Sequence, residues 1–120
     1  EDVVNDVKKE LNVHVESAMN CGVSRWNLLL DPGVGFSKTP DQSFQLLRNL
    51  SKLSSPFPLL VGASRKRFLG PDVTPEERDV ANCALSAVLT YKHNECLAAL
   101  RVHDVGMTRD ALEIARKSLN

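Results

Sequence analysis

Charged and polar residues follow three short apolar runs of the chain, each at the point where the run ends. Asp31 ends the first run, residues 64–66 (SRK) follow the second, and residues 101–104 (RVHD) follow the third. Nearly continuous apolar runs are typical of strands that are buried on both faces of a parallel sheet. Because parallel α/β proteins bind ligands beyond the carboxyl ends of their strands, we expect these three groups to share one site.

The first group is built around a carboxylate and two glycines. Asp31 could accept paired N–H donors from a flat heterocycle, but an Asp before Pro32 is also a common turn or cap residue. Gly33 and Gly35 are either simple turn residues or positions where a ligand approaches the backbone closely. Both interpretations of this loop remain open from the sequence.

The second group is basic. A run such as Arg65-Lys66-Arg67 usually forms a solvated surface. Here it directly follows an expected buried strand, so we expect at least one of its side chains to point into the mouth of the sheet. Lysine would supply a compact cation for a carbonyl or an anion, and arginine a planar fork for phosphate or carboxylate.

The third group combines an arginine and a histidine. Arg101 and His103 are two residues apart, which places them on the same side of a strand. Together they are suited to bind phosphate or pyrophosphate. Asp104 is equally consistent with a partner for either base and with a cap of the next turn. The other histidines, His14 and His93, are expected to be solvated.

Helical patterns separate the three apolar runs. The motifs T-x-x-Q at 39–42 and T-x-x-E at 74–77 are capping boxes that predict helix starts. Thr108 is expected to cap the last helix. Residues 71–79, which surround the second of these helix starts, are expected to form a surface loop. Helices and strands are predicted to alternate, beginning with a helix, over residues 2–21, 26–31, 39–53, 59–63, 74–93, 96–104 and 108–120. This alternation predicts a parallel sheet.

The composition excludes several classes of function. The 120 residues are 42% hydrophobic and 25% charged with zero formal net charge, so no nucleic-acid or membrane partner is expected. No apolar run approaches the ~20 residues that span a bilayer. Cys21, Cys83 and Cys96 lack zinc-ligand or redox spacing and are expected to be free thiols. Since the chain starts within a helical pattern and without Met, we expect it to belong to a longer protein.

Three motifs, DPGVGFSK (31–38), VGASRKRFLG (61–70) and RVHDV (101–105), resemble dihydropteroate synthase in their order and spacing, most closely its eukaryotic branch. That family is a (β/α)8 TIM barrel, which takes ~250 residues. The resemblance therefore implies an α/β fold that is the C-terminal part of such a barrel. Residues 1–120 would be a partial pterin-binding domain with the last three strand-helix units and the helix before them.

The resemblance also implies a reaction. The family condenses 6-hydroxymethyl-7,8-dihydropterin pyrophosphate with 4-aminobenzoate to give dihydropteroate and pyrophosphate in folate biosynthesis, and sulfonamides compete for the aminobenzoate pocket. Mg2+ assists the pyrophosphate, but its ligand is not expected in this chain. The family usually forms homodimers through its last helices and is cytoplasmic or mitochondrial. Other site residues come from earlier strands, so this chain alone is expected to be inactive or nearly so.

The resemblance assigns a ligand to each polar group. The implied pterin contacts are Asp31, Gly35 and Lys66. The implied aminobenzoate pocket is lined by Phe36, Ser64 and Arg65, and the implied pyrophosphate contacts are Arg101 and His103. Lys66 would also border the aminobenzoate pocket. Lys66, Arg101 and His103 would be the residues that take part in catalysis.

Other classes of protein remain open. The methyltetrahydrofolate-binding barrel of corrinoid methyltransferases shares the strand-end aspartate but leaves the SRK and RVH motifs unexplained. A non-catalytic binding module or remnant of the synthase would keep the motifs without turnover. A small doubly wound domain would need a glycine-rich phosphate loop, which DPGVGF fits poorly.

Overall fold

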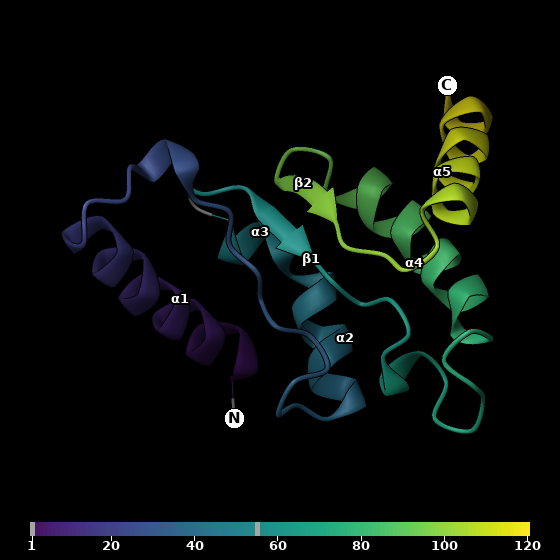
Figure 1. Cartoon of the computed structure of the whole chain (residues 1–120), viewed down its shortest axis with the longest axis horizontal. Helices are drawn as coiled ribbons and strands as arrows, with labels where there is room; N and C mark the ends of the chain where they lie inside the picture. The colour runs from purple at the N-terminus through teal and green to yellow at the C-terminus, as the bar shows by residue number, and fades with distance from the viewer. Residues whose placement is uncertain (1, 55) are drawn as a thin grey trace.

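The computed structural model describes residues 2–54 and 56–120. Figure 1 shows α1 at one end of the molecule, α4 and α5 at the other end, and the two strands between them. In chain order the elements are α1 (Val3–Asn20), the 3-10 helix η1 (Arg25–Asn27), α2 (Pro40–Arg48), α3 (Leu50–Leu53), β1 (Leu59–Val61), the 3-10 helix η2 (Arg67–Leu69), α4 (Arg78–Lys92), β2 (Leu97–Leu100) and α5 (Val105–Leu119).

The sheet is parallel, as predicted. β1 pairs with β2 in a register that places Val61 opposite Leu100, with an irregularity after Leu59. On its other side β1 is joined by Leu30, which forms an isolated parallel bridge with Leu59. The three apolar runs therefore lie side by side in their sequence order and run in the same direction.

The first run is shorter as a strand than the sequence predicts. Only Leu30 pairs, through N–H donation to the Pro58 carbonyl (3.0 Å) and acceptance from the Leu60 N–H (2.9 Å). Arg25–Asn27 form a 3-10 turn instead. Leu29 is 49% exposed, and no strand pairs with its outer edge in the part of the chain that the structure describes. Without a second neighbour, the apolar run does not extend into a regular strand.

The end of the third run also differs from the prediction. β2 ends at Leu100, although the Arg101 N–H still donates to the Val61 carbonyl at 2.9 Å. Asp104, not Thr108, caps α5: its carboxylate accepts the Met107 N–H at 2.8 Å. Thr108 lies in the first turns of the helix instead, where it is buried and its hydroxyl donates to the Asp104 carbonyl.

Both predicted capping boxes form. The Thr39 hydroxyl accepts the Gln42 N–H at 3.2 Å, and the Gln42 side chain accepts the Thr39 N–H at 2.9 Å. The Thr74 and Glu77 pair makes the same reciprocal bonds, but it begins a short turn, and α4 starts only at Arg78.

The predicted helix over 39–53 is interrupted at Asn49, between α2 and α3. The Asn49 side chain donates to the Gln45 carbonyl at 2.8 Å. Such a bond offers the backbone an alternative to the regular helical pattern. The interruption does not expose the apolar side of the segment, because Leu47, Leu50 and Leu53 are all buried.

The core lies between α1, the α2–α3 pair and β1. Its completely or almost completely buried apolar side chains are Val34, Leu46, Leu50, Leu59 and Val61. The buried face of α1 contributes Val3, Val4, Val7 and Val15. No helix among the described residues is long and apolar enough to cross a membrane.

Two predictions about polar residues are wrong. His93, which was expected to be solvated, is 5% exposed, and its Nε2 lies 3.0 Å from the Leu47 carbonyl oxygen. The end of the predicted surface loop 71–79 is also buried, at Arg78 and Asp79. His14 is exposed and the three cysteines are free thiols, as predicted.

Candidate functional site

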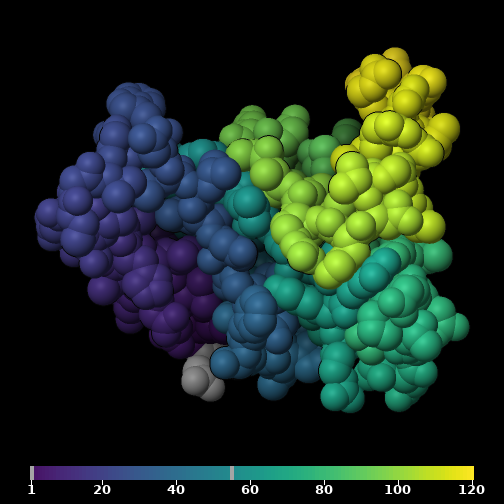
Figure 2. All heavy atoms as spheres, in the orientation of Figure 1, coloured from purple at the N-terminus to yellow at the C-terminus, as the bar shows by residue number. Residues whose placement is uncertain are grey.

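Three loops meet at the carboxyl ends of the strands: residues 31–39, residues 62–66 and residues 101–104. The Lys66 side chain joins the first two, because its Nζ donates to the Val34 carbonyl at 2.6 Å. His103 joins the last two through Ser64. In Figure 2 the blue, teal and yellow-green parts of the chain meet near the middle of the face shown. The structure thus brings together polar groups from all three predicted clusters.

The first loop is a tight turn built on Asp31. Its carboxylate accepts the Gly33 N–H at 2.8 Å, so the turn-forming role considered from the sequence is present. The carboxylate is nevertheless on an exposed residue and remains reachable by a ligand. Lys38 closes the loop from the other side, since its Nζ donates to the carbonyls of Gly33 (3.1 Å) and Phe36 (3.0 Å).

Gly35 allows Lys66 to cross this loop. It has a φ of +79°, a conformation that favours glycine. A Cβ at this position would lie 2.8 Å from Lys66 Cδ, closer than real contacts allow. Gly35 is therefore required by the passage of a neighbouring side chain as well as by its own backbone conformation.

The Lys66 ammonium is held at the centre of the site. Besides the bond to Val34, its Nζ lies 4.1 Å from the centroid of the Phe36 ring, a cation–π contact. Burial lowers the pKa of Lys66, the charges of Lys38 and Arg101 lower it further, and Asp31 acts in the opposite direction. The group is thus a partly desolvated cation among other charges.

Ser64, Arg101 and His103 form a hydrogen-bonded chain. The Ser64 hydroxyl accepts the His103 backbone N–H at 3.1 Å and lies 3.0 Å from Nδ1 of its ring. Arg101 Nη1 lies 2.9 Å from Nε2 of the same ring. The same Nη1 lies 3.2 Å from Nδ1, and because a guanidinium can only donate, the imidazole ring is the acceptor in this contact. The two exposed bases are adjacent, as predicted.

Arg65 is turned away from the other predicted residues. Its Nε and Nη2 donate to the two carboxylate oxygens of Asp79 at 3.0 and 2.9 Å, and Nη1 lies 3.6 Å from Glu76. The hydrogen bonds from Arg65 hold the pKa of the Asp79 carboxyl below its usual range. A role for the stem of Arg65 in an aminobenzoate pocket stays a prediction.

Sequence reasoning missed four residues that build the site: Lys38, Ser43, Arg78 and Asp79. The buried Ser43 hydroxyl accepts the Gly35 N–H at 3.1 Å. Arg78 donates to backbone carbonyls of the loop after β1. A signal for Arg78 does exist, because this residue begins a polar stripe at four-residue spacing, with Asn82 and Ser86, and all three are buried.

The site does not fit a magnesium ion. Mg2+ takes oxygen ligands, mainly carboxylates, phosphates and water. No group of three His, Cys, Asp or Glu side chains in residues 2–54 and 56–120 is placed to hold a metal. At the strand ends, Asp31 lies among the cations Lys38, Lys66 and Arg101.

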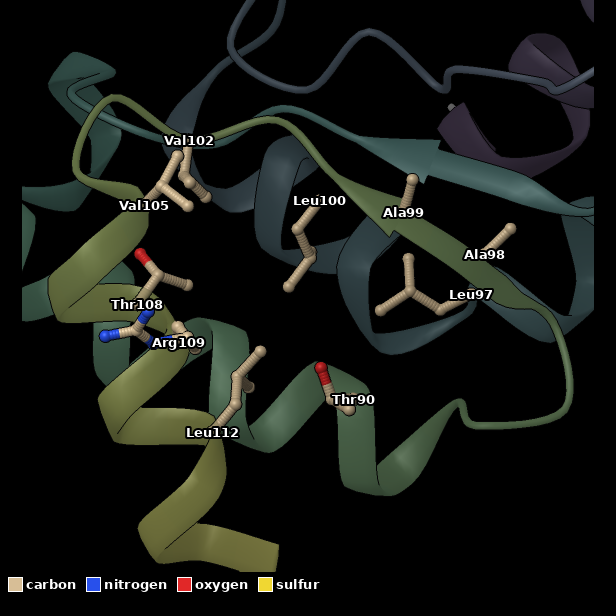
Figure 3. A pocket seen from close by; sticks show the side chains of 10 residues that line it. All are labelled: Thr90, Leu97, Ala98, Ala99, Leu100, Val102, Val105, Thr108, Arg109 and Leu112. Atoms are coloured by element: carbon tan, nitrogen blue, oxygen red, sulfur yellow. The ribbon is translucent and has the colours of Figure 1, made fainter.

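A separate apolar pocket of ≈ 380 Å³ lies between β2, α4 and α5. Figure 3 shows Leu97, Leu100 and Leu112 lining it, with Thr108 and Arg109 among its few polar groups. Val102 belongs to the lining, but neither of its polar neighbours in the RVH motif does. This pocket is therefore distinct from the strand-end site.

Comparison with known proteins gives consistent results. The family described as pterin binding enzyme matches residues 1–103. The dihydropteroate synthase of Mycobacterium leprae is 38% identical over 94% of this chain and 42% of its own length. The mitochondrial folate synthesis bifunctional protein of Arabidopsis thaliana is 35% identical over 95% of this chain and 22% of its own length.

Solved structures agree with these relatives. Xanthomonas albilineans dihydropteroate synthase, in complex with 7,8-dihydropteroate, superposes with a TM-score of 0.89 and 34% identity over 99% of this chain and 46% of that chain. The chain belongs to the pterin-binding enzyme family, and its fold is that of a part of a dihydropteroate synthase barrel, which confirms the predicted fold class. It spans less than half the length of the M. leprae relative. Its assignment to the last three strand-helix units stays a prediction.

Proposed function

We propose that this chain supplies part of the active site of a dihydropteroate synthase, which joins 6-hydroxymethyl-7,8-dihydropterin pyrophosphate to 4-aminobenzoate. The observation that carries the proposal is the position of the Lys66 ammonium. It lies between the Val34 carbonyl and the Phe36 ring, and its pKa responds to both Asp31 and Arg101. One cation thus connects the proposed pterin and pyrophosphate subsites.

In the pterin subsite, Asp31 accepts hydrogen bonds from the amino and ring N–H groups of the pterin. Lys66 donates to the carbonyl side of the same ring. Gly35 keeps the first loop thin enough for the lysine to reach it. An exposed carboxylate beside a desolvated ammonium matches the donor and acceptor edges of a pterin.

The pyrophosphate subsite is formed by Arg101 and His103. In the reaction, the aminobenzoate nitrogen forms a bond to the pterin methylene carbon while the bond from that carbon to the pyrophosphate oxygen breaks. Negative charge then grows on the leaving oxygen, and the amine loses a proton. Preorganised donors at such an oxygen are usually the largest catalytic contribution, a few kcal/mol for each donor.

In the aminobenzoate subsite, Phe36, Ser64 and the stem of Arg65 line the pocket, and Lys66 borders it. The Lys66 ammonium lies over one face of the exposed Phe36 ring. The other face of this ring is then open to a second aromatic ring. A solved structure of the X. albilineans relative contains 4-aminobenzoic acid, which supports this substrate class.

We assign no residue of this chain as a ligand of magnesium, the cofactor implied by the family. The cationic strand-end site offers it no suitable set of ligands. We place its ligand outside the 120 residues.

We further propose a homodimer for the full-length protein, formed through its last helices. Support comes from exposed apolar side chains on α4 and α5, among them Val88, Tyr91, Ile114 and Leu119. The proposed location is intracellular, either cytoplasmic or mitochondrial, and the Arabidopsis relative carries a mitochondrial name.

The proposal is tested by calorimetry on the full-length product of the gene that encodes this chain. Titration with the pterin pyrophosphate is expected to give micromolar binding. Asp31→Asn and Arg101→Ala should each weaken it at least tenfold, which is ~1.4 kcal/mol. Glu16→Gln, an exposed substitution on α1, is the control. Absent binding, or binding that both variants leave unchanged, would instead support a non-catalytic module.

A further inference from the structure

α4 begins with two charged residues that are almost completely buried. Arg78 is 7% exposed and Asp79 is 6% exposed. Charged side chains are rarely buried unless they are paired. Both residues bind the loop of residues 62–73, which leads from β1 to α4 and carries the SRK motif. They lie outside the set of residues assigned to a ligand above.

Asp79 fixes the side chain of Arg65. The two parallel hydrogen bonds, at 3.0 and 2.9 Å, give this pair a defined orientation. Arg65 itself has a φ of +60°, in the left-handed region that non-glycine residues rarely adopt. The ion pair therefore holds Arg65 in a backbone conformation that the residue would not favour alone.

Arg78 fixes the backbone of the same loop. Its guanidinium donates to three carbonyls, those of Arg65 (2.9 Å), Gly70 (2.6 Å) and Val73 (2.9 Å). The first of these belongs to the peptide that joins Arg65 to Lys66. The N–H of that peptide is also held, since Lys66 N donates to the Ala63 carbonyl at 3.2 Å. This peptide is thus bound at both ends.

The fixed peptide controls three contacts at once. Ser64 contacts the loop after β2, Arg65 contacts α4, and Lys66 contacts the loop that follows Leu30. Because the three residues are consecutive, a rotation at Arg65 would move both of its neighbours. The contacts of Ser64 and Lys66 therefore depend on where Arg65 is held.

We infer that Arg78 and Asp79 are positioning residues of the proposed synthase site. By holding Arg65 against α4, they place the Lys66 ammonium and the Ser64 hydroxyl where the substrates are bound. This inference rests on the proposed function for the identity of those substrates. Neither residue is assigned a ligand contact, so any effect on turnover passes through Arg65 and its neighbours Ser64 and Lys66.

The kinetic test is a double-mutant cycle in the full-length gene product. Asp79→Asn keeps the shape of the side chain and removes its charge, and it is expected to lower kcat/KM at least tenfold. In a Lys66→Met background the same change should lower kcat/KM by a clearly smaller factor than in the wild type, because residues that act as a unit are not additive. Asp110→Asn, an exposed aspartate on α5 paired with its neighbour Arg109, is the control.

Either of two results would overturn the inference: unchanged kcat/KM in folded Asp79→Asn enzyme, or effects of the two substitutions that simply multiply. If Asp79→Asn does not fold, Arg78→Lys serves in its place. The lysine side chain keeps the positive charge but lacks the planar guanidinium group that binds three carbonyls at once. Asp79→Glu, which retains the carboxylate, should restore part of the activity.

A measurement that does not depend on catalytic turnover tests this inference separately from the proposed function. The ammonium of Lys66 is followed by NMR titration with isotope-labelled lysine, and Lys66→Arg identifies its signal. The charged groups that face it are Asp31, Lys38 and Arg101, and none of them is altered in Asp79→Asn. Its pKa, lowered in the wild type, should rise toward the ordinary value in the variant. An inactive wild type would refute only the proposed function, whereas an unchanged Lys66 titration in Asp79→Asn would refute the positioning role.

Discussion

Gly35 decides whether the Lys66 ammonium can reach the proposed substrates. Gly35→Ala combines a backbone penalty at φ +79° with a contact of 2.8 Å to Lys66 Cδ. We expect it to lower the free energy of unfolding by about 1–2 kcal/mol for the backbone alone, and by more because Lys66 must move. Pterin binding should weaken as well. Chemical denaturation and calorimetry of the full-length gene product measure the two effects.

Gly22 offers a matched control for this prediction. It has a φ of +92°, yet nothing lies within 4 Å of an added Cβ. Gly22→Ala should therefore show the backbone penalty without any loss of pterin binding. Equal effects of the two substitutions on binding would mean that Lys66 adapts without functional cost.

At the scale of single residues, the sequence predicted where polar groups gather but not how each is held. Asp31 and His103 were found because strand ends of a parallel sheet share one edge, which follows from the element order. The polar stripe that begins at Arg78 is visible in the sequence, but the loop up to 14 residues away that binds Arg78 and Asp79 is not. Local spacing carries no information about such a partner.

Among the helices, α2 gives the cleanest test of local stability. Its capping box is complete on both sides, so Thr39→Ala is expected to cost about 0.5–2 kcal/mol. Thr74→Ala should cost less, because the same bonds there begin a short turn that precedes α4. Denaturant unfolding of the two variants of the full-length gene product compares them. A larger loss at Thr74 would contradict this interpretation.

The C-terminus of α4 is tied to α2 by a titratable contact. His93 Nε2 lies 3.0 Å from the Leu47 carbonyl oxygen, and burial lowers the pKa of His93. A histidine with a lowered pKa binds fewer protons in the folded state than in the unfolded state. Stability therefore falls as the pH drops from about 6.5, the ordinary value, toward the lowered one.

His93→Gln should remove part of this pH dependence, because an amide side chain can still donate to Leu47 but does not titrate. The measurement is Tm of the full-length gene product between pH 7.5 and 5. His14→Gln is the matched control, since His14 is exposed on α1, and it should retain the wild-type slope. If the two variants behave alike, His93 is not the group responsible.

The success of element prediction depended on how local each signal is. The boxes at Thr39 and Thr74 formed because their bonds span three residues. The first strand was reduced to Leu30 because a strand needs neighbours, which an apolar run cannot supply by itself. The burial of His93 was missed for the same reason: its partner, Leu47, is 46 residues away in the sequence.

The whole molecule is more open than a typical domain of its length. Its radius of gyration is 14.9 Å, against about 13.6 Å expected for 120 residues. Its accessible surface is 7544 Å², against about 6400 Å² expected for a monomer of this mass. Large apolar side chains are exposed at both ends of the molecule, among them Trp26, Leu29 and Val105.

This openness leads to the last prediction, that the purified 120-residue chain forms no measurable dihydropteroate. It supplies three strand-end loops, whereas its matched relatives are more than twice as long, and uncovered apolar surface favours association over a single ordered state. A steady-state assay with both substrates, run beside the complete M. leprae enzyme, measures turnover, and sedimentation measures association. Turnover comparable to the complete enzyme would show that these three loops suffice for catalysis. Pterin binding without turnover would instead locate the missing catalytic groups outside this chain.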